Sequence, residues 1–374
     1  MSVYLDNAAA CPCDSDTIDF FRAAMIRFFA NQESLGIHGK ECSVALRESA
    51  ERLSSALCGS EKSGSLLWTN TGTGALLTAV EGTSEEWNGD IVTTPLEHPA
   101  LFLALERAAK RNGCTVHCCE VEHDGRIKPE SLERLLSDRT ALLAMHHVQS
   151  ETGTIQDLVL VRSLLDRCAP RALFLADTIQ SAGKIRIPWE EARLDMMTVS
   201  GQKIGCPSGG ALIYRPKLEK QVRRMRSVSH QIGRCVPAAA MTLANHLSEL
   251  LLELDENAAY AADLKDTLRS SLTKNGISYH QTVKAGHSSP YILHMTLPPY
   301  QGAILTRALH AYEISVAPGS ACESESGGGS QALKAMGFSS QETFCALRVS
   351  TWVDNTVEDM LTFSDALGEC IRKY

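Results

Sequence analysis

Two polar side chains in the sequence follow apolar runs that are typical of buried strands. Asp177 comes directly after residues 172–176, and Lys203 follows residues 196–199 through a short turn. Taken alone, a lysine in a turn is most often a surface charge, and an aspartate at such a place is most often a cap or turn residue. The carboxyl ends of parallel strands meet at one edge of a sheet, where functional groups gather. We therefore expect Asp177 and Lys203 to lie around one crevice.

A short glycine-containing turn follows another apolar run. Gly72, Thr73 and Gly74 come after residues 66–69 and open a predicted helix. Backbone N–H groups at a helix N-terminus bind phosphate well, and glycines let an anion approach closely. The turn matches neither a P-loop nor a G-x-G-x-x-G fingerprint, so by itself it indicates only a candidate phosphate site.

His98 lies beyond the strand predicted at 91–94 and directly precedes Pro99. Proline is favourable at the first position of a helix, so His98 fits the capping position. A histidine also titrates near neutral pH and offers an aromatic face, so His98 equally fits an aromatic platform or a proton carrier. The sequence leaves both interpretations open.

Two residues near the C-terminus could react with or bind a small substrate. Cys322 lies in the small, polar, glycine-rich segment 317–329, which predicts a mobile loop, and a lone cysteine there is a candidate reactive thiol. Arg348 lies within the apolar stretch 345–350. A buried guanidinium needs a partner and its fork matches a carboxylate, so a substrate carboxylate would satisfy Arg348.

The elements that must position these groups follow a regular order. Apolar runs alternate with amphipathic helical patterns through the first half of the chain, which predicts an α/β fold with a mainly parallel sheet covered by helices. A continuous helix at 238–273 then leads into a smaller α+β part. Because 374 residues exceed one hydrophobic core, we predict two domains. The large domain is 14–237, and the small domain is 1–13 with 238–374, which carries the candidate thiol and arginine.

The composition argues against several classes of function. The formal net charge is −8 and no strongly basic face is apparent, so nucleic-acid binding is not expected. No apolar run reaches the ~20 residues that span a bilayer and the N-terminus lacks signal-peptide features, so we expect a cytoplasmic protein without membrane contact. The 13 cysteines are an odd number without paired C-x-x-C spacing, which argues against a disulfide framework and a metal site.

In this order, the motifs resemble those of the cysteine desulfurases of the class V aminotransferase family, which are fold-type I enzymes that use pyridoxal 5′-phosphate (PLP). The resemblance covers nearly the whole chain. The matching segments are 4–9 (Y-L-D-N-A-A), 31–39 (a diverged N-P-x-S-x-H-x-x-G), 97–98 (E-H), 151–157 (E-x-G-x-x-Q-D), 177–181 (D-A-x-Q-S), 200–203 (S-x-H-K), 319–322 (G-S-A-C) and 347–350 (I-R-x-S).

The resemblance implies a seven-stranded sheet of the PLP fold type I and a homodimer. It also implies that the chain converts L-cysteine to L-alanine and leaves a persulfide on Cys322, from which a protein acceptor takes the sulfur. Lys203 would hold PLP as a Schiff base and move protons, and Asp177 would pair with the pyridinium nitrogen. The other implied cofactor contacts are Gln180, His98, Gly72, Thr73, Ser200 and Gln202, the implied substrate contacts are Arg348, Asn7, Ala8 and Ser150, and the implied catalytic groups are Lys203, Cys322 and His98.

The chain departs from the family pattern around the same site. Gln202 replaces the histidine before the lysine, Gln149 and Ser150 replace two asparagines, and Cys235 replaces a threonine that the family sends across its dimer to the phosphate. These changes keep open a selenocysteine lyase, a C–S β-lyase or an aminotransferase on the same fold. They also keep open a non-catalytic sulfur relay or binding protein.

Overall fold

The structure is a computed structural model that describes residues 2–60, 63–319 and 329–374. Its central element is a seven-stranded sheet in the order β2-β8-β7-β6-β5-β3-β4. Within it, β8 runs antiparallel to its neighbours and the remaining pairs are parallel, so the predicted mainly parallel sheet is confirmed. The strands are β2 (Ser65–Thr69), β3 (Asp90–Thr93), β4 (Val116–Cys118), β5 (Thr140–His146), β6 (Leu173–Asp177), β7 (Met196–Ser200) and β8 (Gly210–Tyr214).

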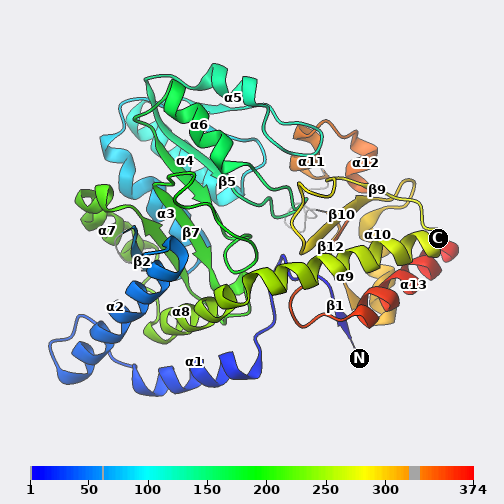
Figure 1. Ribbon diagram of the computed structural model, residues 1–374, viewed down its shortest axis with the longest axis horizontal. Helices are drawn as coiled ribbons and strands as arrows, with labels where there is room; N and C mark the ends of the chain where they lie inside the picture. Colours follow the sequence, from blue (N-terminus) through cyan, green and yellow to red (C-terminus); the bar gives the residue numbers. More distant parts are fainter. Residues whose placement is uncertain (1, 61–62, 320–328) are drawn as a thin grey trace.

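Helices cover both faces of this sheet (Figure 1). One face packs against α3 (Gly72–Thr83), α4 (Pro99–Asn112) and α7 (Val222–Ile232). The other packs against α2 (Ile37–Cys58), α5 (Pro129–Leu135), α6 (Leu158–Cys168) and α8 (Pro237–Leu252), and α1 (Ser15–Arg27) lies on α8. Because both faces are covered, β7 and β8 are buried at every position, which explains why the strands appear as apolar runs rather than alternating patterns.

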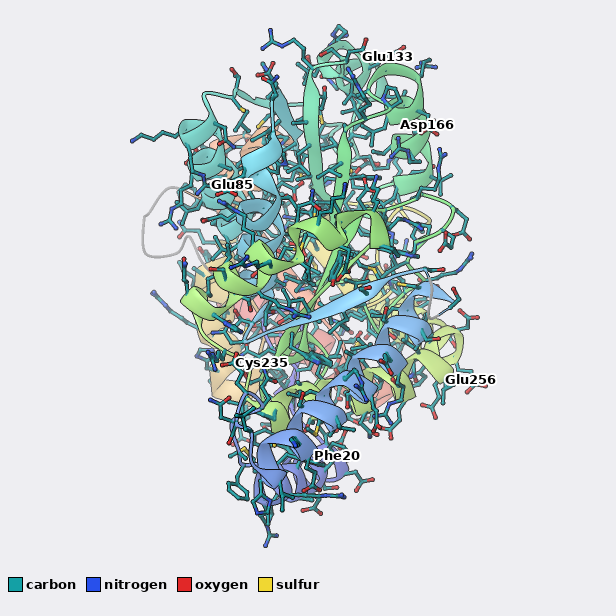
Figure 2. The ribbon with its side chains drawn as sticks, turned by 90° about the vertical axis from the view of Figure 1, so that its left-hand side faces the viewer. Phe20, Glu85, Glu133, Asp166, Cys235 and Glu256 are labelled. Carbon is teal, nitrogen blue, oxygen red and sulfur yellow. The ribbon has the colours of Figure 1, made fainter. Side chains whose placement is uncertain are left out.

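The helices around the large sheet extend to two opposite ends of this part of the molecule. Figure 2 shows α1 and α2 at one end, where Phe20 is exposed, and Glu133 and Asp166 of α5 and α6 at the opposite end. No helix among the described residues is long and apolar enough to cross a membrane.

A smaller α+β part surrounds a second core. Its three-stranded antiparallel sheet has the order β12-β10-β9, and a two-stranded parallel sheet pairs β1 with β11. The N-terminal strand therefore lies with the C-terminal part of the chain. The elements are β1 (Val3–Tyr4), α9 (Leu254–Lys274), β9 (His280–Gln281), β10 (Ile292–Thr296), α10 (Gly302–Leu309), β11 (Ile314–Ser315), α11 (Gln331–Ala335), α12 (Ser340–Phe344), β12 (Ala346–Ser350) and α13 (Val357–Lys373).

The continuous helix predicted at 238–273 is wrong, because α8 and α9 are separated at Glu253. The apolar face of α8 packs into the core of the large sheet, whereas the apolar face of α9 contributes Leu264 and Leu268 to the second core. The two helices run nearly end to end (Figure 1), and the interruption lies near the point where their contacts pass from the first core to the second. The domain division predicted at residue 237 stays a prediction.

Candidate active site

Three parallel strands end next to one another and bring polar residues to one edge of the sheet. In the strand register, His146 of β5 pairs with Asp177 of β6, and Asp177 pairs with Thr198 of β7, two residues before Ser200. Lys203 follows β7 through the short 3-10 helix Gly201–Lys203. The structure thus brings Asp177, Ser200 and Lys203 to the same edge of the sheet.

Asp177 is a buried carboxylate that has hydrogen-bond donors but no cationic partner. Its Oδ1 accepts from the Thr198 hydroxyl and from the backbone N–H of Ile179, each at 3.1 Å. Among the described residues, no lysine, arginine or histidine forms an ion pair with it. Burial raises the pKa of Asp177 to about 6. A ligand with a protonated ring nitrogen would supply the missing positive charge.

Lys203 lies close to the N-terminal segment of the chain. Its Nζ donates to the carbonyl of Ala9, and its own carbonyl accepts from the Cys11 thiol at 3.1 Å. Burial lowers the pKa of Lys203, and the positive charges of Lys184 and Arg348 lower it further. A lysine amine reacts with a carbonyl carbon only when it is uncharged, so these surroundings favour a nucleophilic amine.

The N-terminus of α3 forms a cradle beside these strand ends. A Cβ placed on Gly72 would lie 2.6 Å from Ile179 Cδ1 and 2.8 Å from Ser200 Cβ, so no larger residue fits. The Thr71 hydroxyl caps the helix by accepting from the Gly74 N–H at 3.0 Å, whereas Thr73 is exposed. The first N–H groups of a helix have no intrahelical acceptor and favour an anion, so this cradle fits a phosphate.

His98 is the N-cap of α4. Its Nδ1 accepts from the Ala100 N–H at 3.1 Å and Pro99 occupies the first helical position, so the capping interpretation is confirmed. Burial lowers the pKa of His98, and the positive charge of Lys203 lowers it further. The cap requires Nδ1 to be unprotonated, which leaves Nε2 and the ring face available. The role as an aromatic platform stays a prediction.

Gln180 and Gln202 occupy different environments. The buried Gln180 donates from Nε2 to the Ala8 carbonyl at 2.8 Å and accepts from Lys184 Nζ at 3.3 Å. Gln202 is exposed, and its backbone carbonyl accepts from the Cys11 N–H at 2.9 Å. The structure therefore holds Gln180 in a fixed orientation and leaves the Gln202 side chain in solvent.

Arg348 of β12 is buried and already has a carboxylate partner. Its guanidinium contacts Asp6 Oδ1 at 2.6 Å and the Ser150 carbonyl at 3.0 Å. Within the part of the chain that the structure describes, the Arg348 Nε has no hydrogen-bond partner. The sequence predicted a substrate carboxylate as the partner of Arg348. Asp6 is therefore a partner that sequence reasoning missed. A substrate would have to share this guanidinium with Asp6.

The other candidate substrate contacts are tied to the C-terminal part of the chain. The Asn7 amide donates to the Ser350 carbonyl at 2.9 Å and to Asn355 Oδ1 at 3.1 Å, and the Ala8 N–H donates to the Ser350 hydroxyl at 2.9 Å. The Asn7 side chain is thus engaged within the protein. Ser150 contacts Arg348 through its backbone carbonyl and not through its side chain.

Cys322 lies outside the described residues. Gly319 precedes and Ser330 follows the segment 320–328 that contains Cys322, and both lie beside Glu151. A Cβ on Gly319 would lie 3.3 Å from Glu151 Oε1, and the Ser330 hydroxyl donates to Glu151 Oε2 at 2.9 Å.

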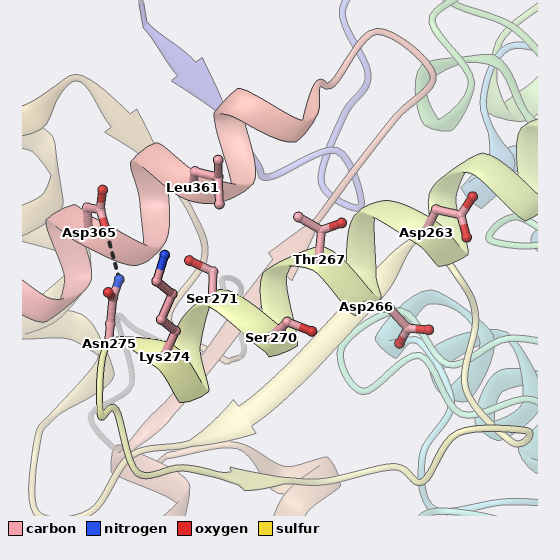
Figure 3. A pocket seen from close by; sticks show the side chains of 9 residues that line it. All are labelled: Asp263, Asp266, Thr267, Ser270, Ser271, Lys274, Asn275, Leu361 and Asp365. Carbon is pink, nitrogen blue, oxygen red and sulfur yellow. Dashed lines mark hydrogen bonds between the residues drawn. The ribbon is translucent and has the colours of Figure 1, made fainter.

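A surface groove in another part of the molecule is unrelated to these groups. It lies between α9 and α13 and is lined by Asp263, Asp266, Lys274 and Asp365, with the Asn275 amide donating to Asp365 at 2.8 Å (Figure 3). None of the residues singled out from the sequence lines this groove. It presents mainly polar and acidic side chains to solvent, so we base no function on it.

The residues at the strand ends fit a cofactor that has a phosphate, a protonated aromatic ring and an aldehyde. The α3 cradle fits the phosphate, the unpaired Asp177 fits the ring nitrogen, and Lys203 fits the aldehyde carbon. Sequence reasoning missed Lys184, whose amine lies among these groups. The position of Lys184 four residues after Gln180 was the available signal, but a lysine in a loop is usually exposed.

Comparison with known proteins agrees with this arrangement. The chain is 28% identical to a cysteine desulfurase of Gluconacetobacter diazotrophicus, over 100% of this chain and 94% of the relative. It is 25% identical to a putative cysteine desulfurase IscS 1 of Bacillus subtilis, over 99% of each. A solved NifS-like protein superposes with a TM-score of 0.87 at 24% identity, over 100% of both chains. The aminotransferase class-V family profile matches residues 3–363, and the chain belongs to that family.

Proposed function

We propose that this protein is a PLP-dependent cysteine desulfurase that converts L-cysteine to L-alanine. The observation that carries the proposal is the buried Asp177, which has no ion-pair partner among residues 2–60, 63–319 and 329–374, beside Lys203 and the glycine cradle of α3. Two relatives that match nearly the whole chain are named cysteine desulfurases. A solved protein of similar fold is described as SspA in complex with cysteine, with a TM-score of 0.75, 18% identity, and 95% of this chain and 100% of that chain covered.

Each cofactor contact has a physical reason. The N–H groups of α3 at Gly72 and Thr73, with Ser200, would bind the phosphate, and Asp177 would keep the ring nitrogen protonated. Gln180 would donate to the ring hydroxyl, and His98 would cover the ring face. When bound, PLP withdraws electrons from the bonds of the substrate at Cα. Lys203 would bond the cofactor, and its amine would carry protons to and from the substrate.

The substrate would bind where the small part of the molecule meets the sheet edge. Arg348 would hold the carboxylate of cysteine, with Asn7, Ala8 and Ser150 shaping the pocket around it. The Cys322 thiolate would attack the substrate sulfur, so that one C–S bond breaks and one S–S bond forms. The carbon fragment takes up a proton and leaves as alanine, and the sulfur stays on Cys322 as a persulfide.

Four properties belong to the same proposal. We infer a homodimer, a protein that accepts the persulfide sulfur, a cytoplasmic location, and a division into domains at 14–237 and at 1–13 with 238–374. The family resemblance supports the dimer and the acceptor. The absence of a membrane-spanning helix among the described residues is compatible with the location.

The test is an absorption spectrum of the purified protein before and after L-cysteine, with alanine and sulfide measured under a reductant. We expect a PLP band that changes on addition of cysteine, and equal amounts of alanine and sulfide. Cys322→Ala should keep the PLP band and lose sulfide release, and Cys168→Ala, a partly buried thiol of the sheet region, is the control. Pyruvate and ammonia in place of alanine would show β-elimination. A protein that does not bind added PLP would overturn the proposal.

A further inference from the structure

Lys184 is a buried lysine in the site that the proposed function does not use. Its residue is 2% exposed, and its Nζ lies 5.3 Å from the centre of the Trp352 ring. Among the described residues, no carboxylate lies within ion-pair distance of this amine. Desolvating a lysine without an acidic partner is costly, so the position calls for a reason other than stability.

The hydrogen bonds around Lys184 determine the orientation of one amide. A lysine amine only donates, so the Gln180 atom 3.3 Å from Lys184 must be the carbonyl oxygen. The Ala8 carbonyl only accepts, so the Gln180 atom 2.8 Å from it must be the NH2 nitrogen. Both contacts require the same orientation of the Gln180 amide. In the reversed orientation the NH2 group would face the Lys184 amine, and the amide oxygen would face the Ala8 carbonyl. The second hydrogen of the Gln180 NH2 is then left for a ligand.

Hydrogen bonds connect the same amine, through Gln180, to the short segment that also binds Lys203. Gln180 and Lys203 bind adjacent carbonyls, those of Ala8 and Ala9. The charge of Lys184 lowers the pKa of Lys203, as does Arg348, while Cys11 and Asp6 act in the opposite direction. The pKa of Lys184 is itself lowered, by burial first, with Cys11 opposing and Arg348 adding to the shift. A neighbouring cation is one of the known ways in which proteins make a lysine nucleophilic.

We propose that Lys184 is a positioning residue that holds the Gln180 amide as a donor toward the cofactor and keeps the Lys203 amine reactive by a second nearby positive charge. This inference rests on the proposed function, because it assigns Lys203 and Gln180 to the same PLP. It adds a residue that contacts neither the cofactor nor the substrate and acts through two residues that would.

The first test measures Lys203 in the full-length protein freed of PLP, so that it does not depend on activity. The pH dependence of Lys203 labelling by acetic anhydride is followed by peptide mass spectrometry. In the wild type we expect a midpoint below the ordinary lysine value of about 10.4. In Lys184→Met the midpoint should rise by about one pH unit, the size expected when a nearby like charge is removed. In Lys184→Arg, which keeps the charge, it should stay near the wild-type value.

The second test is a titration with PLP. Lys184→Met should weaken PLP binding about fivefold, the effect of one hydrogen bond when the Gln180 amide is free to turn. Lys265→Met is the matched control, because Lys265 is also buried but binds Ser288 and Ser289 on the small part of the molecule. That variant should lose stability without changing the labelling midpoint or the PLP affinity.

Each outcome decides the proposal. If Lys184→Met lowers thermal stability but leaves the labelling midpoint of Lys203 at the wild-type value, Lys184 is a structural residue. If Lys184→Met does not fold, a wild-type midpoint at the ordinary lysine value would overturn the proposal by itself. Failure of the desulfurase reaction in a protein that binds PLP would leave both readouts unchanged. Failure to bind PLP would still leave the labelling of Lys203 as a readout, so the two proposals fail separately.

Discussion

The two sides of the candidate site are built in different ways. On the sheet side, Asp177 and Lys203 lie at strand ends, and their charges are not neutralised by an ion-pair partner among the described residues. On the opposite side, Arg348 lies inside a strand and is paired with Asp6, 342 residues away in the sequence. The charged groups on the sheet side would thus be paired by a ligand, whereas Arg348 on the other side already stabilises the fold through its ion pair.

This difference separates stability from function. Buried charges without partners lower the stability of the ligand-free protein, so removing them should cost little stability and much activity. Removing Arg348 leaves the Asp6 carboxylate unpaired and should cost stability as well as activity. Substitutions on the two sides of the site should therefore differ in their effect on stability.

Lys203→Ala should abolish the covalent PLP band and the activity, because it removes the amine that would bond the aldehyde carbon and carry protons. The free energy of unfolding should change by less than about 1 kcal/mol, since the lost amine has no carboxylate partner. The measurements are the PLP absorption band and urea unfolding. Lys40→Ala, an exposed lysine on α2, is the control and should retain both. A Lys203→Ala protein that still desulfurates cysteine would remove Lys203 from the mechanism.

Arg348→Ala should destabilise the fold by about 3–5 kcal/mol in urea unfolding, because Asp6 and the Ser150 carbonyl lose their common partner. The double variant Arg348→Ala with Asp6→Asn removes the unpaired charge and should recover part of the loss. Activity should stay low in both, since neither can hold a substrate carboxylate. Full recovery of activity in the double variant would show that the arginine serves only the fold.

Sequence patterns predict the sheet side well and the other side poorly. Asp177, Ser200 and Lys203 each follow an apolar run, so their common edge follows from the parallel sheet alone. The Asp6 partner of Arg348 could not be found this way, because no local pattern connects residues so far apart. The break at Glu253 was missed because the helical pattern continues on both sides of it, so no local signal marks the single residue that interrupts the helix. Lys184 was missed although it lies four residues after Gln180, because burial of a lysine is a tertiary property.

The pH dependence of stability should identify Asp177 in the protein freed of PLP. Its folded pKa is raised to about 6 from the ordinary 3.8 by burial, so between these values the folded state holds more protons than the unfolded state. Stability therefore falls as pH rises from about 4 to about 6, by up to about 3 kcal/mol from this group. Above pH 6 its contribution is constant.

Asp177→Asn should remove this fall and leave a flatter profile over the same range, measured by urea unfolding at several pH values. Since asparagine cannot hold the ring nitrogen protonated, activity should drop at least about a hundredfold while the protein stays folded. Identical pH profiles for the variant and the wild type would mean that another group titrates there. Bound PLP should also flatten the wild-type profile, because it supplies the missing cation.

The smallest effect concerns His98. Two substitutions separate its role as the N-cap of α4 from its predicted role as an aromatic platform for the cofactor ring. His98→Asn keeps a side-chain acceptor for the Ala100 N–H but loses the ring, so stability should stay within a few tenths of a kcal/mol while activity falls. His98→Phe keeps the ring and loses the cap, so the fold should lose about 1 kcal/mol. If His98→Phe retains the PLP band at the wild-type wavelength while His98→Asn shifts it, the ring covers the cofactor. If both variants keep the wild-type spectrum and turnover, His98 is only a helix cap. The sheet side of the site would then also contain a residue that serves the fold, as Asp6 does on the other side.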